Sequence, residues 1–272
     1  MRHAVMVLGY GEDCSVLQST INLLDDPDIS FFIHWDKKYN LPKVTSQKSP
    51  LIFVENRMDV KWGSFSLIEA TVLLLKKVKS TAIFDYVHLI SSNDIPLMTK
   101  EYFKNYFTKD TYIGFQHVTD KEKRRIQYYF PNNLDFRKHR YLYFLMRKVN
   151  GLFRINRLKH RNIDVEKGCE WFSIKYKFVD QILSYDLSLF AHGYCADELF
   201  MQTIFASKKP KKISNNDNFD ALRYIDWKRG APYTFTNKDI KELQRVVNTN
   251  FAFGRKITDP TIVKEIFINA KE

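Results

Sequence analysis

The stretch Ala4-Val5-Met6-Val7-Leu8, followed by Gly9-Tyr10-Gly11, decides the fold class of this chain. An unbroken apolar run suits a strand that is buried on both faces, as strands of parallel sheets are. Glycines directly after it permit a tight turn, and the next apolar residues, from Val16 to Leu24, recur at helical spacing. A buried strand, a glycine turn and a helix in this order predict the start of an α/β sheet.

Three further apolar runs continue this alternation. They predict strands at residues 29–36, 51–54 and 86–90, with a helix at residues 67–78 between the last two. Neither a linker nor a repeat nor a low-complexity stretch interrupts the pattern. We therefore expect one mixed α/β domain with helices on both faces of the sheet.

Polar side chains stand at the carboxyl ends of two predicted strands. His34 and Asp36 close one strand, and Asp94 lies in the turn that follows the strand at residues 86–90. Ligands of open α/β sheets bind at this edge, so these side chains are candidate ligand contacts. A buried core histidine and turns capped by their own side chains are the open alternatives.

Three carboxylates, those of Glu170, Asp197 and Glu198, are surrounded in sequence by Trp, Phe, Met and Cys. Apolar surroundings disfavour an ionised acid and raise its affinity for a proton, which suits a general base. Asp197 directly precedes a predicted helix, and we interpret it as the N-cap of that helix.

Nearly all of the formal net charge of +12 lies in one segment. Residues 121–161 contain 13 Lys or Arg and two acids, interleaved with aromatic residues. Such a segment indicates a polyanionic partner or an anionic surface. A solvated basic helix, a lid over an anionic substrate and a nucleic-acid-binding surface are alternatives, the last because aromatic residues stack on bases.

The chain has three cysteines, Cys14, Cys169 and Cys195, without the CxxC spacing of zinc sites. This number and spacing favour neither a disulfide framework nor a metal, and predict a reducing compartment. The pattern of a signal peptide is missing, and so is an apolar run of membrane-spanning length. We expect a cytoplasmic protein, or one peripheral on the inner membrane face.

Seven stretches carry a family resemblance by their order and spacing over most of the chain: residues 32–38, 60–66, 84–97, 167–173, 197–203, 222–227 and 253–257. In these stretches the sequence resembles the core-2/I-branching β-1,6-N-acetylglucosaminyltransferases, glycosyltransferase family 14, which also includes peptide O-xylosyltransferases. It departs from the family pattern at Ser64, Ser92, Gly254 and Ile257. These positions line or support the donor region in the family, so the resemblance says more about the reaction than about the sugar.

The resemblance implies a GT-A-like, Rossmann-like mixed sheet in a single domain, residues 1–272. Within it, residues 1–118 would bind the nucleotide sugar, 119–166 would form a helical basic insertion, and 167–272 would hold the acceptor and the catalytic groups. It also implies an inverting reaction without a metal or another cofactor. Metal-using GT-A enzymes need two acids at a strand end to hold a cation, and here Asp36 stands alone.

By resemblance, Glu198 is the catalytic base and Glu170 is an acceptor-binding residue or a rival base. Arg255 and Lys256 match the basic pair that meets the charge of the leaving UDP, a role that preorganised cations can fill without a metal. Asp36, Asp94, Trp62 and Arg223 are further candidates for contacts with the donor.

The function that follows is transfer of a sugar from a UDP-sugar to a hydroxyl of a glycan acceptor. GlcNAc is the preferred donor sugar, with xylose, galactose and glucuronic acid as alternatives. We expect a bacterial enzyme of surface polysaccharide synthesis, with a lipid-linked acceptor and an anionic membrane surface as partners and no nucleic acid. A nucleic-acid-binding protein that uses the basic segment is the alternative from another class.

Overall fold

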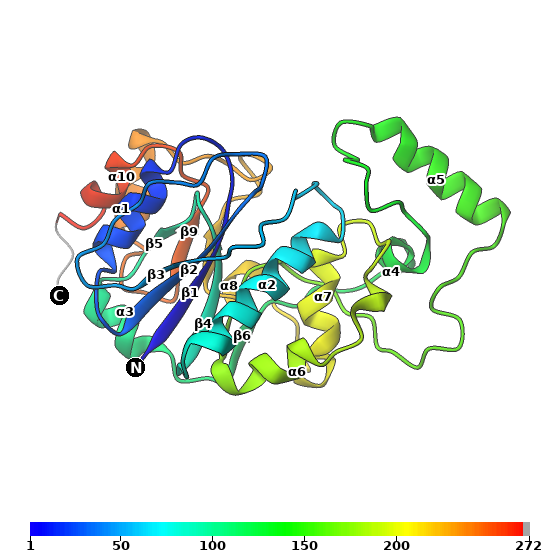
Figure 1. The fold of residues 1–272 in the computed structure, drawn as a ribbon, viewed down its shortest axis with the longest axis horizontal. Helices are drawn as coiled ribbons and strands as arrows, with labels where there is room; N and C mark the ends of the chain where they lie inside the picture. Colours follow the sequence, from blue (N-terminus) through cyan, green and yellow to red (C-terminus); the bar gives the residue numbers. More distant parts are fainter. Residues whose placement is uncertain (269–272) are drawn as a thin grey trace.

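The computed structural model describes residues 1–268, which are built around a six-stranded sheet of order β3-β2-β1-β4-β7-β6 (Figure 1). The strands are β1 (His3–Gly9), β2 (Ile29–Trp35), β3 (Leu51–Phe53), β4 (Tyr86–Ser91), β6 (Thr111–Ile113) and β7 (Phe172–Lys175). Strands β1 to β4 are parallel, and β7 runs antiparallel to both β4 and β6. This mixed sheet confirms the predicted fold class.

Helices cover both faces of the sheet, as the sequence predicts. Met6 and Leu8 of β1 face a core formed with α2 (Ser66–Thr81), α6 (Val179–Leu183) and α7 (Asp197–Ile204). Val5 and Val7 face the opposite core, with α1 (Ser15–Leu23) and α3 (Lys100–Tyr106). Because β1 is buried on both faces, its continuous apolar run is the pattern that this position requires.

Residues 95–255 contribute a second sheet, of order β5-β9-β8. It consists of β5 (Ile95–Pro96), β8 (Arg223–Ile225) and β9 (Phe253–Arg255), flanked by the short helices α8 (Asp217–Asp220), α9 (Ile240–Gln244) and α10 (Thr261–Glu265). Because β5 follows β4 after one turn, its partner β9 ends close to the carboxyl end of β4. The amide of Ile257 accordingly donates to the carbonyl of Asn93 at 3.0 Å.

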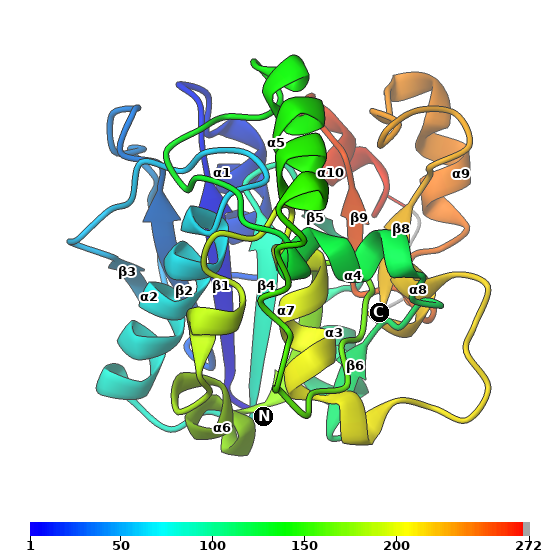
Figure 2. The same cartoon turned by 90° about the vertical axis from the view of Figure 1, so that its right-hand side faces the viewer.

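The basic segment forms α4 (Asp120–Gln127), whose start is capped by Thr119 and Glu122, and α5 (Arg140–Leu152). Helix α5 stands apart from the body of the molecule, at the end above α4 (Figures 1 and 2). Its Tyr143 ring lies 4.3 Å from the ring of Tyr194, which precedes α7. The helical insertion that the sequence predicts is therefore joined to the body through aromatic contacts beside α7.

Candidate active site

The carboxyl ends of β1, β2 and β4 lie side by side. The amide of Asp36 donates to the carbonyl of Gly9 at 2.8 Å, and that of Ser92 donates to the carbonyl of Leu8 at 3.2 Å. The parallel register of the three strands brings the segments that follow them to one edge. The candidate ligand contacts at Asp36 and Asp94 therefore belong to the same edge of the sheet.

Asp36 is buried and already has local partners. Its Oδ1 accepts the amide of Lys38 at 3.0 Å, and its Oδ2 lies 2.7 Å from the Lys38 ammonium. Lys38 also pairs with Asp59 at 3.0 Å and donates to the carbonyl of Val60. Asp36 thus fixes, through Lys38, the loop that leads to Trp62.

His34 belongs to the core. Its Nε2 accepts the amide of Met58 at 2.9 Å, which orients the segment after β3. Burial lowers the pKa of His34 to about 4, so the imidazole is neutral at neutral pH and free to accept this bond. Of the two interpretations open for this residue, the structure agrees with the core histidine.

Asp94, which is buried, and Arg255, which is partly buried, form an ion pair between the two sheets. The Arg255 Nη1 lies 2.7 Å from Asp94 Oδ1, and the guanidinium carbon lies 4.4 Å from the centre of the Trp171 ring. Asp94 also accepts the amide and the hydroxyl of Ser91 at 2.8 and 2.7 Å. Both carboxylate oxygens are therefore occupied, and Asp94 contributes to this region by orienting Arg255.

Lys256 follows Arg255 and points to the neighbouring strand end. Its ammonium lies 5.8 Å from the centre of the Tyr10 ring, directly after β1. Within residues 1–268 it makes no ion pair with a carboxylate. The edge therefore presents an ammonium whose charge no carboxylate of the described chain neutralises.

Arg223 does not fit the predicted contact with the donor. Its side chain is 1% exposed and lies over the ring of Phe253 at 4.9 Å. Its Nη atoms donate to backbone carbonyls at 2.6 to 3.0 Å, those of Ala221, Leu89 and Phe172. Burial lowers its pKa to about 10, which still leaves it charged at neutral pH. Arg223 joins the two sheets and does not face the strand ends.

The side chain of Glu198 is more exposed than its apolar sequence neighbours suggest. Its side chain is 40% exposed, and its Oε2 lies 2.8 Å from Arg125 Nη1 and 3.7 Å from the Lys167 ammonium. Within the described residues its Oε1 makes no hydrogen bond. One oxygen is therefore held by two cations, and the other is available to a substrate.

Glu170 and Asp197 are partly buried acids, each with one oxygen atom that is fully buried. Glu170 Oε1 and Asp197 Oδ1 are inaccessible to solvent and have no hydrogen-bond partner in the described chain. Burial, followed by the charge of Asp197, raises the pKa of Glu170 to about 8. Burial, followed by the charge of Glu198, also raises the pKa of Asp197. Glu170 and Asp197 therefore show the raised proton affinity expected from their surroundings.

Asp197 is not the N-cap of α7. The cap residue is Ala196, and Asp197 is the first residue within the helix. Its predicted role is therefore wrong by one position. The Asp197 Oδ1 is buried without a hydrogen-bond partner in the described residues, and the charge of Asp197 acts on Glu170.

Arg125 is a residue of this site that the sequence analysis missed. Besides Glu198, it donates from Nε to the carbonyl of Tyr194 at 3.1 Å and from Nη2 to that of Cys195. It comes from α4 and so connects the basic insertion with the start of α7. No sequence signal marks it, because Arg125 is one of many basic residues in its segment and Glu198 lies 73 positions away.

Trp62 lies beside Tyr194, whose carbonyl accepts a hydrogen bond from Arg125. It is 38% exposed, with the guanidinium of Arg137 at 4.7 Å from its ring and the Tyr194 ring at 6.1 Å. The Cys195 amide donates to the carbonyl of Gly63 at 2.7 Å. The loop of Trp62 is thus attached to the segment that carries the acids, with its indole accessible to a ligand.

The predicted residues converge around Glu170. Its protonation is influenced by Asp197, Arg255, Glu198 and Asp94, which come from α7, β9 and the end of β4. Lys256 follows Arg255 in the chain. Asp36 lies at the same edge of the sheet as Asp94, and the loop of Trp62 is bonded to Cys195. In residues 1–268, no group of three or more His, Cys, Asp and Glu side chains is arranged to hold a metal ion. The cluster can therefore supply a proton acceptor, a protonated acid and fixed cations.

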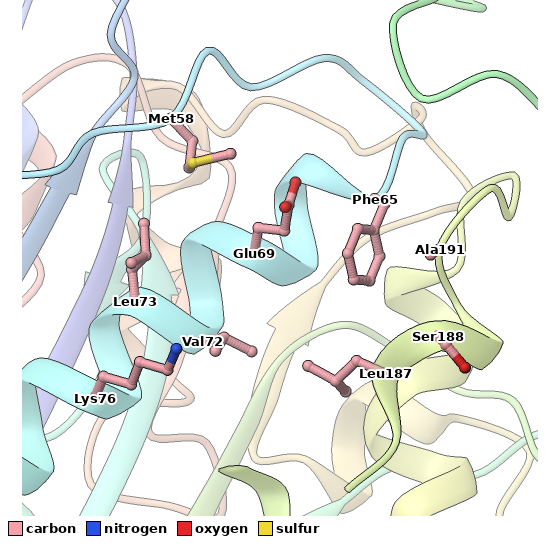
Figure 3. A pocket seen from close by; sticks show the side chains of 9 residues that line it. All are labelled: Met58, Phe65, Glu69, Val72, Leu73, Lys76, Leu187, Ser188 and Ala191. Carbon is pink, nitrogen blue, oxygen red and sulfur yellow. The ribbon is translucent and has the colours of Figure 1, made fainter. Parts of the chain in front are cut away.

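A separate apolar groove of about 410 Å³ runs along α2 (Figure 3). Val72 and Leu73 line one wall, and Leu187 lines the other. Glu69 stands in this groove, where burial raises the pKa of its carboxyl group. None of the acids and cations of the cluster lines the groove, so we treat it as distinct from the candidate site.

The chain matches one known protein family by sequence. A family model described as core-2/I-branching enzyme matches residues 4–247. Among solved structures, the apo form of mouse xyloside xylosyltransferase 1 is similar to this chain with a TM-score of 0.36 and 11% sequence identity, over 93% of this chain and 96% of that one. The curated protein sequences contain no match to the chain. None of the helices within residues 1–268 combines the length and the apolar character needed to cross a bilayer.

Proposed function

The chain belongs to the core-2/I-branching enzyme family and is a glycosyltransferase, and on this premise we propose that it transfers a sugar from UDP to an acceptor hydroxyl with inversion and without a metal. The observation that carries the proposal is the position of Arg255, which Lys256 follows in the chain, beside the acid cluster. Inversion needs one base for the attacking hydroxyl and a positive environment for the leaving diphosphate.

Glu198 is the base in this proposal. Its Oε2 is held by Arg125 and Lys167, which leaves the partly exposed Oε1 to accept the proton of an acceptor hydroxyl. A carboxylate kept in one orientation by two cations loses little freedom when the acceptor binds. The reaction then forms the bond from the acceptor oxygen to the anomeric carbon, breaks the bond to UDP, and leaves the hydroxyl proton on Glu198.

Glu170 contacts the acceptor as a protonated acid. With a pKa of about 8 it keeps its proton at neutral pH and cannot serve as the base there. A protonated carboxyl group can donate one hydrogen bond and accept another. This pair of functions suits a sugar hydroxyl, which also both donates and accepts.

Lys256 and Arg255 stabilise the leaving UDP. Arg255 is oriented by Asp94, whereas Lys256 has no carboxylate partner among the described residues and keeps its full charge for a phosphate. A lysine ammonium binds phosphate as a compact point charge. We therefore assign the larger share of diphosphate binding to Lys256.

The donor sugar is GlcNAc in our proposal, with xylose, galactose and glucuronic acid as alternatives, because the family resemblance supports the reaction more strongly than the sugar. The acceptor is a glycan of a bacterial surface polysaccharide, carried on a lipid diphosphate at the inner membrane face. The basic segment favours such an anionic acceptor at a membrane surface, and the enzyme is then cytoplasmic or peripheral.

A screen of UDP-sugars by thermal stabilisation tests the proposal. A ligand that binds only the native state raises the melting temperature by mass action, so the true donor and UDP should both do so in the presence of EDTA. Hydrolysis of the stabilising donor would give a first measure of turnover. Stabilisation that requires Mn²⁺ would contradict the metal-free mechanism, and stabilisation by no nucleotide would contradict the donor class.

A further inference from the structure

Helix α5 carries apolar side chains on the face that is turned away from the body. These side chains include Tyr141, Phe144, Leu145 and Leu152, which are 68%, 49%, 48% and 78% exposed. They are separated by three, one and seven positions, so they share one face of the helix. Phe153, which directly follows the helix, adds a further apolar side chain at this end and is 69% exposed. Lys148 is exposed on the same face, and a group of large exposed apolar side chains of this kind marks an interaction surface.

The opposite side of α5 explains why this face is outward. Tyr143 packs on Tyr194, and the buried Asn150 bonds the backbone of Tyr129 at 2.7 and 2.9 Å. These contacts fix the rotation of the helix about its axis. The outward apolar face is therefore a consequence of the packed structure, and the 13 residues of α5 extend it over about 20 Å.

The surroundings of this face are strongly cationic. Residues 136–163 contain nine Lys or Arg and no Asp or Glu. Arg137, Lys138, Arg140, Lys148 and Arg154 are exposed there. Aromatic and aliphatic side chains flanked by basic ones are the features of helices that lie in the headgroup region of anionic bilayers.

We propose that α5 docks on an anionic lipid bilayer through the face formed by Tyr141, Phe144, Leu145, Leu152 and Phe153, with the basic residues around it on the lipid headgroups. Charge complementarity favours an anionic bilayer as the partner. Insertion of the apolar side chains into the bilayer adds a hydrophobic contribution to binding, which a purely electrostatic contact lacks. A nucleic acid would use the cations but leaves the aliphatic Leu145 and Leu152 without a contact.

Docking in this way orients the candidate site. The parallel strands point toward the end of the molecule that carries α5 (Figure 2), and Arg137 lies over Trp62 at the rim of the site. The acid cluster would then open near the headgroup region. This orientation rests on the proposed function, and it delivers a lipid-linked acceptor to Glu198 without removing its lipid from the bilayer.

Sedimentation of the full chain with vesicles tests the docking. Vesicles of phosphatidylcholine with phosphatidylglycerol should bind the protein at least about 10-fold more strongly than vesicles of phosphatidylcholine alone, since each basic residue near an anionic surface adds roughly a factor of five. The double variant Phe144→Ser with Leu145→Ser should lower binding at every salt concentration. The variant Arg140→Gln with Lys148→Gln should lower it chiefly at low salt.

Matched controls are Ile83→Ser, which removes an exposed apolar side chain far from α5, and Lys211→Gln with Lys212→Gln, which removes two exposed charges. Both should bind like the unaltered chain. Equal binding to the two kinds of vesicle, equal binding by all variants, or tighter binding to an oligonucleotide than to the anionic vesicles would overturn the proposal. Because the assay needs neither donor nor turnover, its failure is distinguishable from a failure of the proposed function.

Discussion

Arg125 Nη1 donates to Glu198 Oε2 at 2.8 Å, and this bond joins the basic insertion to the first turn of α7. The same guanidinium donates to the carbonyls of Tyr194 and Cys195, so its position is set by the backbone that leads into the helix. A charged group held in this way imposes its geometry on the carboxylate. The orientation of the proposed base therefore depends on a residue from a segment outside the nucleotide-binding sheet.

Replacing Glu198 by Gln should lower the transfer rate by about 10² to 10⁴-fold, because the amide keeps the shape of the side chain but cannot accept the acceptor proton. UDP affinity, measured by calorimetry, should stay unchanged. Normal turnover by this variant together with an inactive Glu170→Gln variant would exchange the roles of the two acids.

Arg125→Ala should lower kcat at least about 10-fold with little effect on KM for the donor, since Glu198 loses its orientation while the diphosphate contacts remain. The unfolding free energy should fall by about 2 kcal/mol as two backbone carbonyls lose a charged donor. Arg124→Ala, an exposed neighbour on the same helix, is the matched control and should leave both quantities unchanged. An equal loss in the two variants would remove the positioning role of Arg125.

Lys256→Ala should weaken UDP binding at least about 10-fold, because a fixed cation at the diphosphate is lost. Lys264→Ala removes an exposed lysine a short distance along the chain and should bind UDP normally. Titration of both variants with UDP in a calorimeter makes the comparison. If Lys256→Ala keeps its affinity, the diphosphate must lie elsewhere.

The raised pKa of Glu170 predicts that the unfolding free energy depends on pH. Its pKa is about 8 in the folded chain and about 4.3 in an unfolded one, so between these values the folded state binds more protons. The unfolding free energy should therefore fall as pH rises from about 4 to about 8. Glu170→Gln lacks this ionisation, and its melting temperature should rise relative to that of the unaltered chain over the same interval. Parallel curves would show that folding does not change the pKa of Glu170.

Arg223→Lys tests whether Arg223 joins the two sheets through backbone carbonyls, as the structure indicates, instead of contacting the donor. Lysine keeps the charge but cannot donate in the planar arrangement that reaches the backbone carbonyls, so the unfolding free energy should fall by about 2 kcal/mol or more. The folded fraction should bind UDP with normal affinity. A selective loss of UDP binding at unchanged stability would restore the original assignment.

Local pattern was sufficient for the elements that carry the site. The continuous apolar runs of β1 and β2 predicted buried strands, because a strand covered on both faces needs apolar residues at successive positions. Placement of Asp36 and Asp94 at one edge followed from the parallel order of these strands. The convergence of Glu198 and Arg255 came from the family resemblance and not from any local signal.

The sequence by itself determined the α/β class, the family and the residues that could carry charge at the strand ends. Only the tertiary structure decided what state those residues are in. It paired Glu198 with Arg125, buried one oxygen atom each of Glu170 and Asp197 without a hydrogen-bond partner in the described residues, and turned Arg223 into the core. The physical reason is that burial and ion pairing depend on groups far apart in the chain, whereas periodicity and capping depend on neighbours a few positions away.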